Sequence, residues 1–120
     1  MLDATFDPDT KLVTVLASGH VTHEDYEAVM IPTVENAAAG GGKIRLLYIL
    51  GPEFEGFGAH AMWDDTKLGM RHFSDFEKVA AVTDNILIQN AVRAFGMLMP
   101  AEVRAFDLAD REAAEAWVIA

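Results

Sequence analysis

The sequence contains no cysteine, and this absence excludes several kinds of site. Disulfide bonds, thiolate-ligated metal centres and cysteine nucleophiles all need a sulfur atom that the chain does not carry. Serine is nearly as scarce, since it occurs only at Ser18 and Ser74, and neither position belongs to a recognisable nucleophile motif. No nucleophile–base–orienter set can be assembled, so we expect a protein that is not an enzyme and has no cofactor.

Basic residues are also few: 9 lysines and arginines stand against 19 acidic residues, and the formal net charge is -10. No basic stripe exists to replace phosphate counterions, so a nucleic-acid partner is not expected. The same charge disfavours docking onto an anionic membrane, and membrane contact is expected to be peripheral at most. Nothing resembles a signal peptide, and no apolar run approaches about 18 residues, so a cytoplasmic location is expected.

The residues that are present predict one globular domain over 1–120, with 52% hydrophobic and 23% charged residues. Apolar runs predict short strands, and helical periodicity between them predicts four helices. The strands are expected at 2–6, 11–18, 43–50, 78–83 and 103–107. Turn residues at 7–9 join the first two strands in a hairpin. The order of elements predicts an α/β fold: a mostly parallel sheet of about five strands with an N-terminal hairpin and four helices.

Helix ends can be read from capping residues. Thr22 stands three residues before Asp25, a near relative of the capping box, and Pro32 should kink the helix that follows. The glycines at 40–42 end this helix, one of them in the left-handed region. Asp84 is expected to cap the third helix, which runs from about 85 to 98.

The most strongly amphipathic helix is expected at 59–73. Its predicted buried face consists of Ala59, Met62, Trp63, Thr66, Gly69, Met70 and Phe73. A polar stripe lies opposite, where Asp64 is expected to pair with Lys67 at the surface. Asp64 and Asp65 point about 100° apart, so they are not expected to act as an acid–base pair.

The segment at 51–58, GPEFEGFG, is predicted to be a glycine-rich crossover loop. It follows the carboxyl end of the central strand, which is where open parallel sheets bind ligands. Two interpretations remain open for its aromatic residues. Phe54 and Phe57 could close a pocket together with Met62 and Trp63, or both rings could simply cover the end of the sheet.

The third helix is more apolar than core packing requires. Its predicted buried face consists of Leu87, Ile88, Ala91, Val92, Phe95, Leu98 and Met99. Gln89, Asn90 and Arg93 mark the predicted solvent-facing side, but Ile86 and Met97 fall on that side too. Ile86, Met97 and Met99 therefore form a candidate surface for a partner subunit or a bilayer; the alternative is ordinary core with scattered exposed apolar residues.

A metal site is not expected. His20, His23 and Glu24 stand close in sequence, but Glu27 rather than a histidine follows four residues after His23, so the spacing is not that of a zinc-binding helix. Solvated loop and cap residues are the better interpretation of this group.

Four stretches of sequence, taken together, resemble the SpoIIAA-like family, a bacterial group related to STAS domains. They read VTHEDYEAVMIPTVENA, GKIRLLYIL, AMWDDTKLGMRHFSDFEKVAAVTD and FGMLMPAEVRAFDLADREAAEAWV. The resemblance implies a β–α superhelix also seen in CRAL-TRIO lipid-binding domains. It further implies no established reaction, and either binding of an apolar ligand or membrane association through movable helices. Anti-sigma-factor antagonists of the related group carry a phosphorylatable serine at the start of the helix after the central strand. Residues 51–62 contain no serine or threonine, so a phospho-switch is rejected.

We therefore expect a non-enzymatic STAS-like module that holds a small apolar or amphipathic, lipid-like ligand between the helices at 59–73 and 85–98. The contacts are expected from Phe54, Phe57, Met62, Trp63 and Phe95. His60 is expected to fix a polar head group. The alternative is a homodimeric or regulatory protein-interaction module without a phospho-switch. An enzyme using Glu53, Glu55 or His60 is a third hypothesis, for which nothing in the sequence defines a substrate.

Overall fold

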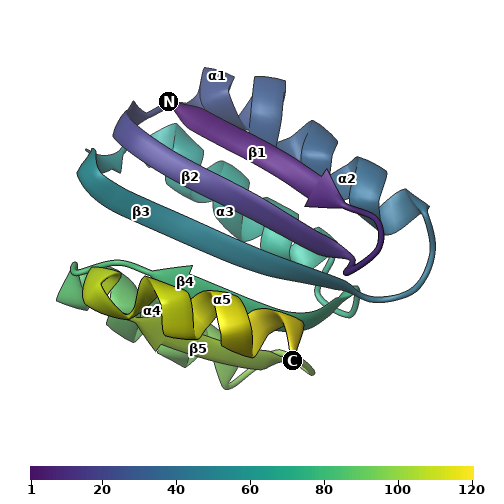
Figure 1. The fold of residues 1–120 in the computed structure, drawn as a ribbon. Helices are drawn as coiled ribbons and strands as arrows, with labels where there is room; N and C mark the ends of the chain where they lie inside the picture. Colours follow the sequence, from purple (N-terminus) through teal and green to yellow (C-terminus); the bar gives the residue numbers. More distant parts are fainter.

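Five strands form one sheet, in the order β1-β2-β3-β4-β5, in the computed structural model, which describes residues 1–120 (Figure 1). The strands are β1 (Leu2–Asp7), β2 (Leu12–Val21), β3 (Ile44–Phe57), β4 (Phe76–Val82) and β5 (Glu102–Phe106). β1 pairs with β2 in an antiparallel hairpin, and the other three pairs are parallel. The predicted fold class is therefore confirmed.

The helices alternate with the strands along the chain. They are α1 (His23–Asp25), the π-helical turn η1 (Tyr26–Met30), α2 (Ile31–Ala39), α3 (Ala59–Arg71), α4 (Ile86–Gly96), the short 3-10 turn η2 (Leu108–Asp110) and α5 (Arg111–Ile119). The first predicted helix corresponds to the continuous run α1–η1–α2. None of the helices combines the length and apolar character needed to cross a membrane.

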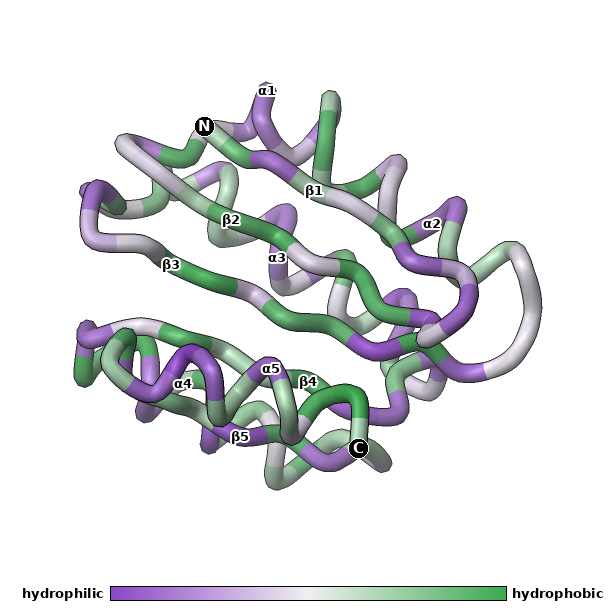
Figure 2. The backbone as a smooth tube through the Cα atoms, in the orientation of Figure 1, coloured by the Kyte–Doolittle hydropathy of each residue, from purple (hydrophilic) through white to green (hydrophobic).

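The sheet is covered unequally on its two faces (Figure 1): α1 to α4 lie on one face, and α5 lies on the other. The side chains of β3 alternate between these layers, as strand geometry requires. Leu46 and Tyr48 belong to the larger core under the four helices. Leu47 and Ile49 belong to a smaller core with α5. β3 is thus buried on both faces, and Figure 2 shows the hydrophobic residues running along its first half.

The predicted crossover loop at 51–58 is wrong, because β3 continues through this segment to Phe57. The backbone partner is the extended end of β2, where Gly19 pairs with Phe54 and Val21 pairs with Phe57. The register shifts on both sides of Gly19, so the extension is an irregular, bulged ladder. The aromatic residues therefore sit on a strand that is anchored by backbone hydrogen bonds.

The predicted helix signals have mixed outcomes. The capping box of Thr22 and Asp25 is confirmed, with both reciprocal hydrogen bonds present. The irregularity expected at Pro32 takes the form of the π-helical turn η1, after which the regular helix resumes with proline in its first turn. The N-cap of α4 is Asn85 and not Asp84, since Asn85 Oδ1 accepts from two backbone N–H groups. Asp84 accepts a hydrogen bond from the Leu108 backbone instead, at 2.9 Å.

Candidate functional site

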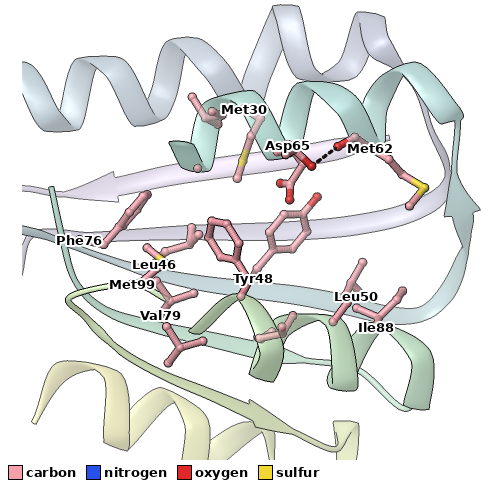
Figure 3. Close-up of a pocket in the computed structure, with 18 of the residues that line it drawn as sticks. Met30, Leu46, Tyr48, Leu50, Met62, Asp65, Phe76, Val79, Ile88 and Met99 are labelled. Carbon is pink, nitrogen blue, oxygen red and sulfur yellow. Dashed lines mark hydrogen bonds between the residues drawn. The ribbon is translucent and has the colours of Figure 1, made fainter. Parts of the chain in front are cut away.

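A cavity of about 300 Å³ lies between α3 and α4, over the face of β3 and β4 (Figure 3). Of the 19 residues that line it, 16 are hydrophobic. Leu46, Tyr48 and Leu50 of β3 form part of its floor, because alternate residues of a strand share one face. The two helices approach each other at Gly69, where an added Cβ would lie 3.3 Å from Phe95 Cζ.

One carboxyl group interrupts this apolar lining. Asp65 projects from α3, and its Oδ1 accepts a hydrogen bond of 2.7 Å from the Tyr26 hydroxyl. Since Tyr26 donates to Asp65, the Tyr48 hydroxyl, 2.9 Å away, must donate to Tyr26. Asp65 Oδ2 has no hydrogen bond within the chain, and Figure 3 shows the carboxylate pointing toward the Tyr48 hydroxyl and the cavity. The cavity thus has an apolar body and one polar end with a free acceptor.

The surroundings of this polar group alter its proton affinity. Asp65 is open along the cavity, yet its carboxyl is enclosed by apolar walls, and this desolvation raises its pKa, while the hydrogen bond from Tyr26 acts in the opposite direction. Burial also raises the pKa of Tyr26 and of Tyr48, and the nearby charge of Asp65 adds to both shifts. The tyrosines therefore remain neutral donors, and the arrangement can accept a hydrogen bond or a positive charge from a ligand.

The structure brings only some of the expected ligand-binding residues to this cavity. Phe57, Met62 and Phe95 line it. Phe54 lies outside the lining and packs edge-on against Phe57, with ring centroids 5.0 Å apart. Trp63 is 57% exposed on the outer side of α3. His60, the sixth residue, packs against His23 and not against the cavity.

The predicted buried face of α3 is wrong in its rotation about the helix axis. The side chains that are buried belong to Ala61, Asp64 and Leu68, whereas Trp63 and Met70 are exposed. The expected pair of Asp64 and Lys67 is present, with Nζ 3.9 Å from Asp64 Oδ1, but its expected surface location is wrong because Asp64 is only 2% exposed. Apolar character was a poor guide here, because several apolar residues of α3 face the cavity mouth or solvent.

The close partner of Asp64 is His23, whose Nδ1 lies 2.5 Å from Asp64 Oδ2. His60 stacks on the ring of His23 and does not line the cavity, so it is not placed to hold a head group there. His23 thus meets His60 and Asp64 rather than forming a group with His20 and Glu24.

Sequence reasoning missed Asp65 and the two tyrosines. A signal for Asp65 was present: it occupies the same stripe of α3 as Met62 and Gly69, at spacings of three and four residues. A charge beside an apolar stripe indicates either a defect or a binding site. The pairing of Tyr26 with Tyr48 had no local signal, because the two residues are 22 positions apart in the sequence and meet only in the folded chain.

The apolar residues of α4 are also distributed differently from the prediction. Ile86 is 60% and Met97 is 86% exposed, whereas Met99 is half-buried and lines the cavity, so the three do not share one surface. Leu87 and Leu98, expected in the core, are exposed at 76% and 73%. These four exposed side chains stand at the two ends of α4.

Gln89 was expected on the solvent-facing side of α4 but is only 5% exposed. Its amide nitrogen donates to the Thr83 carbonyl at 2.6 Å and to Asp107 Oδ1 at 2.7 Å. A buried amide is stable when its hydrogen bonds are made, and these two attach α4 to the ends of β4 and β5. One wall of the cavity is therefore held by polar contacts as well as by packing.

Comparison with known proteins connects this arrangement to a family. A family profile described as SpoIIAA-like matches residues 12–119, a range that contains every residue lining the cavity. The crystal structure of an uncharacterized protein of the DUF3478 family with a SpoIIAA-like fold, from Shewanella loihica PV-4, is similar with a TM-score of 0.79. The two are 32% identical, and the alignment covers 98% of this chain and 93% of that chain. No curated protein matches.

Proposed function

This chain belongs to the SpoIIAA-like family, and we propose its function from the cavity it contains. The chain binds a small amphipathic molecule. The apolar body of that molecule lies between α3 and α4, and a hydrogen-bond-donating group at one end meets the carboxyl of Asp65. No reaction is part of this proposal.

The cavity itself is the observation that carries the proposal. Protein interiors are close-packed, and voids larger than a water molecule are few. Ligand pockets have volumes of about 300–1,000 Å³ and are mostly apolar with a few polar groups that orient the ligand. A cavity of about 300 Å³ with 16 hydrophobic lining residues and one unshared carboxylate oxygen fits this description.

The polar end selects among amphipathic ligands. Asp65 can accept from an alcohol or pair with an amine, whereas the carboxylate of a fatty acid would meet like charge in a setting of low dielectric constant. The net charge of -10 also repels anionic ligands and attracts cationic ones over longer distances. We therefore favour an alkyl alcohol or amine over a fatty acid, and Asp65 takes the head-group role that the sequence suggested for His60.

Three eight-carbon compounds that differ only in their polar group test this proposal. 1-Octanol and octylamine should displace Nile red, a neutral fluorescent probe, from the protein, and octanoate should not. Asp65→Asn should weaken octylamine by about tenfold or more, the value of one hydrogen bond to a charged group, and weaken 1-octanol less. Asp3→Asn, an exposed change on β1, is the matched control and should change neither compound. Equal displacement by octanoate, or none by any compound, would contradict the proposal.

A second pair of variants tests where the ligand lies. Ala91→Phe adds a ring to the cavity wall, and Ala94→Phe adds the same ring to an exposed position of α4 that does not line the cavity. The first should abolish displacement, because it fills the space that the ligand needs. The second should leave displacement unchanged. If Ala91→Phe and Ala94→Phe changed displacement equally, the ligand would bind outside this cavity.

A homodimer is the second candidate function. The support for it is the set of apolar side chains exposed at the ends of α4: Ile86, Leu87, Met97 and Leu98. Exposed apolar patches mark association sites, and each end of α4 presents two such neighbouring side chains. Light scattering across a concentration series should show a dimer that Met97→Asp dissociates and that Met70→Asp, a change at an exposed methionine of α3, leaves intact. A monomeric mass at every concentration would remove this candidate.

A further inference from the structure

Three side chains able to ligate a metal ion converge where α1 lies against α3. His23 comes from α1, while His60 and Asp64 are four residues apart on α3. Their ligand atoms all lie within 4.8 Å of one another. The two imidazole rings are stacked, with centroids 3.7 Å apart and planes inclined by 4°. This group is separate from the cavity, because none of its members belongs to the lining.

An ion pair explains only part of this arrangement. His23 Nδ1 lies 2.5 Å from Asp64 Oδ2, so a proton or another positive charge must lie between two atoms that would otherwise repel each other. His60, however, makes no hydrogen bond, and its Nε2 lies 3.9 Å from Asp64 Oδ1. The stacked ring of His60 therefore brings a second imidazole nitrogen close to the same carboxylate, and the packing of α1 against α3 does not require this.

The second ring nitrogen of His23 is already oriented. His23 Nε2 lies 2.9 Å from Glu27 Oε1, within the distance of an ion pair. This leaves Nδ1 as the ligating nitrogen, and a carboxylate behind a ligating histidine is the usual outer partner at protein zinc sites. The spacing of His60 and Asp64, i and i+4 on one helix face, is the spacing by which helices present two ligands to one ion.

We propose that His23, His60 and Asp64 bind a divalent transition-metal ion of the zinc class, with Glu27 positioning His23. Two imidazoles and one carboxylate are a donor set suited to Zn²⁺, and three protein ligands leave the fourth position open to water or to another molecule. Ligands about 2.0–2.1 Å from a tetrahedral ion are separated by about 3.3 Å. The His23–Asp64 pair therefore opens slightly on binding, and His60 moves closer.

The position of the site supports this movement. Asp64 is 2% exposed and fixed in the core side of α3, whereas the side chains of His23 and His60 are 27% and 59% exposed and can adjust. Glu24 and Glu27 flank the opening in a chain of net charge -10, so cations are attracted to it. α1 is a single turn held by its capping box, and a metal would join it to α3 directly.

Isothermal titration of the tag-free protein with Zn²⁺ tests the proposal. One equivalent should bind the wild type, and Co²⁺ in its place should produce the visible absorption of a tetrahedral ion. His60→Ala should weaken binding by at least about tenfold, within the range for losing part of a metal site. This variant is the cleanest, because His60 is mostly exposed and makes no hydrogen bond, so folding should not depend on it.

His20→Ala is the matched control, since His20 is an exposed histidine outside the group, and it should bind Zn²⁺ like the wild type. Glu27→Gln should weaken binding by a smaller factor, because it acts only through His23. In a nuclear magnetic resonance titration, Zn²⁺ should shift the ring signals of His23 and His60 and not those of His20. An absence of saturable binding, or equal affinity in wild type and His60→Ala, would overturn the proposal.

Discussion

Replacing Gly96 with alanine should destabilise the protein, although the same change in an isolated helix is stabilising. Gly96 is the last residue of α4, and alanine is favoured over glycine in a helix by up to about 1 kcal/mol. In the folded chain, however, an added Cβ would lie 2.6 Å from Val103 Cβ and 2.9 Å from Val103 Cγ1 on β5. Carbon atoms prefer separations of about 3.5–4.0 Å, so α4 must move away from the sheet.

The size of the effect follows from these distances. Overpacking of a core costs about 1–3 kcal/mol, and the upper part of that range applies because Val103 Cβ is attached to the backbone and cannot rotate away. Subtracting the helix-propensity gain leaves a net loss of about 1–2 kcal/mol. The entropy of unfolding is about 2.1 cal/mol/K per residue, so for 120 residues the melting temperature should fall by about 4–8 °C.

Urea unfolding followed by circular dichroism measures this loss directly, with Gly69→Ala as the matched control. Gly69 also lies within a helix, but its added Cβ would meet only the ring of Phe95, with Cζ at 3.3 Å and Cε1 at 3.5 Å. The Phe95 ring is the far end of a side chain that borders the cavity and can move into it, so the propensity gain should persist and the control should be stabilised by up to about 1 kcal/mol.

Two results would refute this reasoning. Gly96→Ala with wild-type stability would mean that α4 does not lie as close to β5 as the structure places it. Gly69→Ala with a loss as large as that of Gly96→Ala would mean that Phe95 has no free space beside it, and the cavity would then be filled by side chains. Val103→Ala should rescue Gly96→Ala only partly, because it removes the two γ-methyl groups and leaves the Cβ in place.

The remaining predictions concern protonation and capping. Burial raises the folded-state pKa of Asp65, so its contribution to stability is present below the unfolded value of 3.8 and is lost as pH rises through the raised value. Asp65→Asn should therefore be more stable than the wild type at neutral pH. Urea unfolding across pH should show this difference in stability disappearing in acid. In metal-free protein the hydrogen bond to Asp64 raises the folded-state pKa of His23 above 6.5, so its stabilising contribution is complete below pH 6.5 and is lost as pH rises through the folded-state value. A nuclear magnetic resonance titration of the His23 ring should show this raised value, and a midpoint at or below 6.5 would contradict it. Thr22→Ala removes the side-chain half of the capping box with Asp25 and should cost about 1 kcal/mol in chemical denaturation, whereas Thr22→Ser should cost little.

Local patterns predicted those parts of the fold that depend on short stretches of chain. The apolar run at 43–50 identified a strand buried on both faces, and Thr22 with Asp25 identified the helix start. Local patterns failed at 51–57, where the backbone is extended because the end of β2 lies beside it. No property of Gly51 to Phe57 alone distinguishes that strand from a loop, since the hydrogen-bonding partner is more than thirty residues earlier in the sequence.

The candidate sites show the same division more clearly. The sequence placed a ligand between the third and second long helices and named Phe57, Met62 and Phe95 for it, and the structure places these three around the cavity. It assigned Asp64 to the surface, and it rejected an acid–base pair with Asp65 without giving Asp65 another role. The assignment of Asp64 assumed that charged residues face water, a rule that fails where a partner from a distant segment compensates the charge.

By itself, the order of residues determined that this chain forms an α/β sheet with a double-sided central strand, because hydrophobic periodicity and capping act within a few residues of each other. Only the tertiary structure decided which face of α3 is buried, since His23, some forty residues away, supplies the partner of the buried Asp64, and Tyr26 supplies a partner for Asp65 at the cavity. Whether a charge can be buried depends on what the rest of the fold places within hydrogen-bonding distance. That distance is a property of the assembled chain and is not encoded in any one segment.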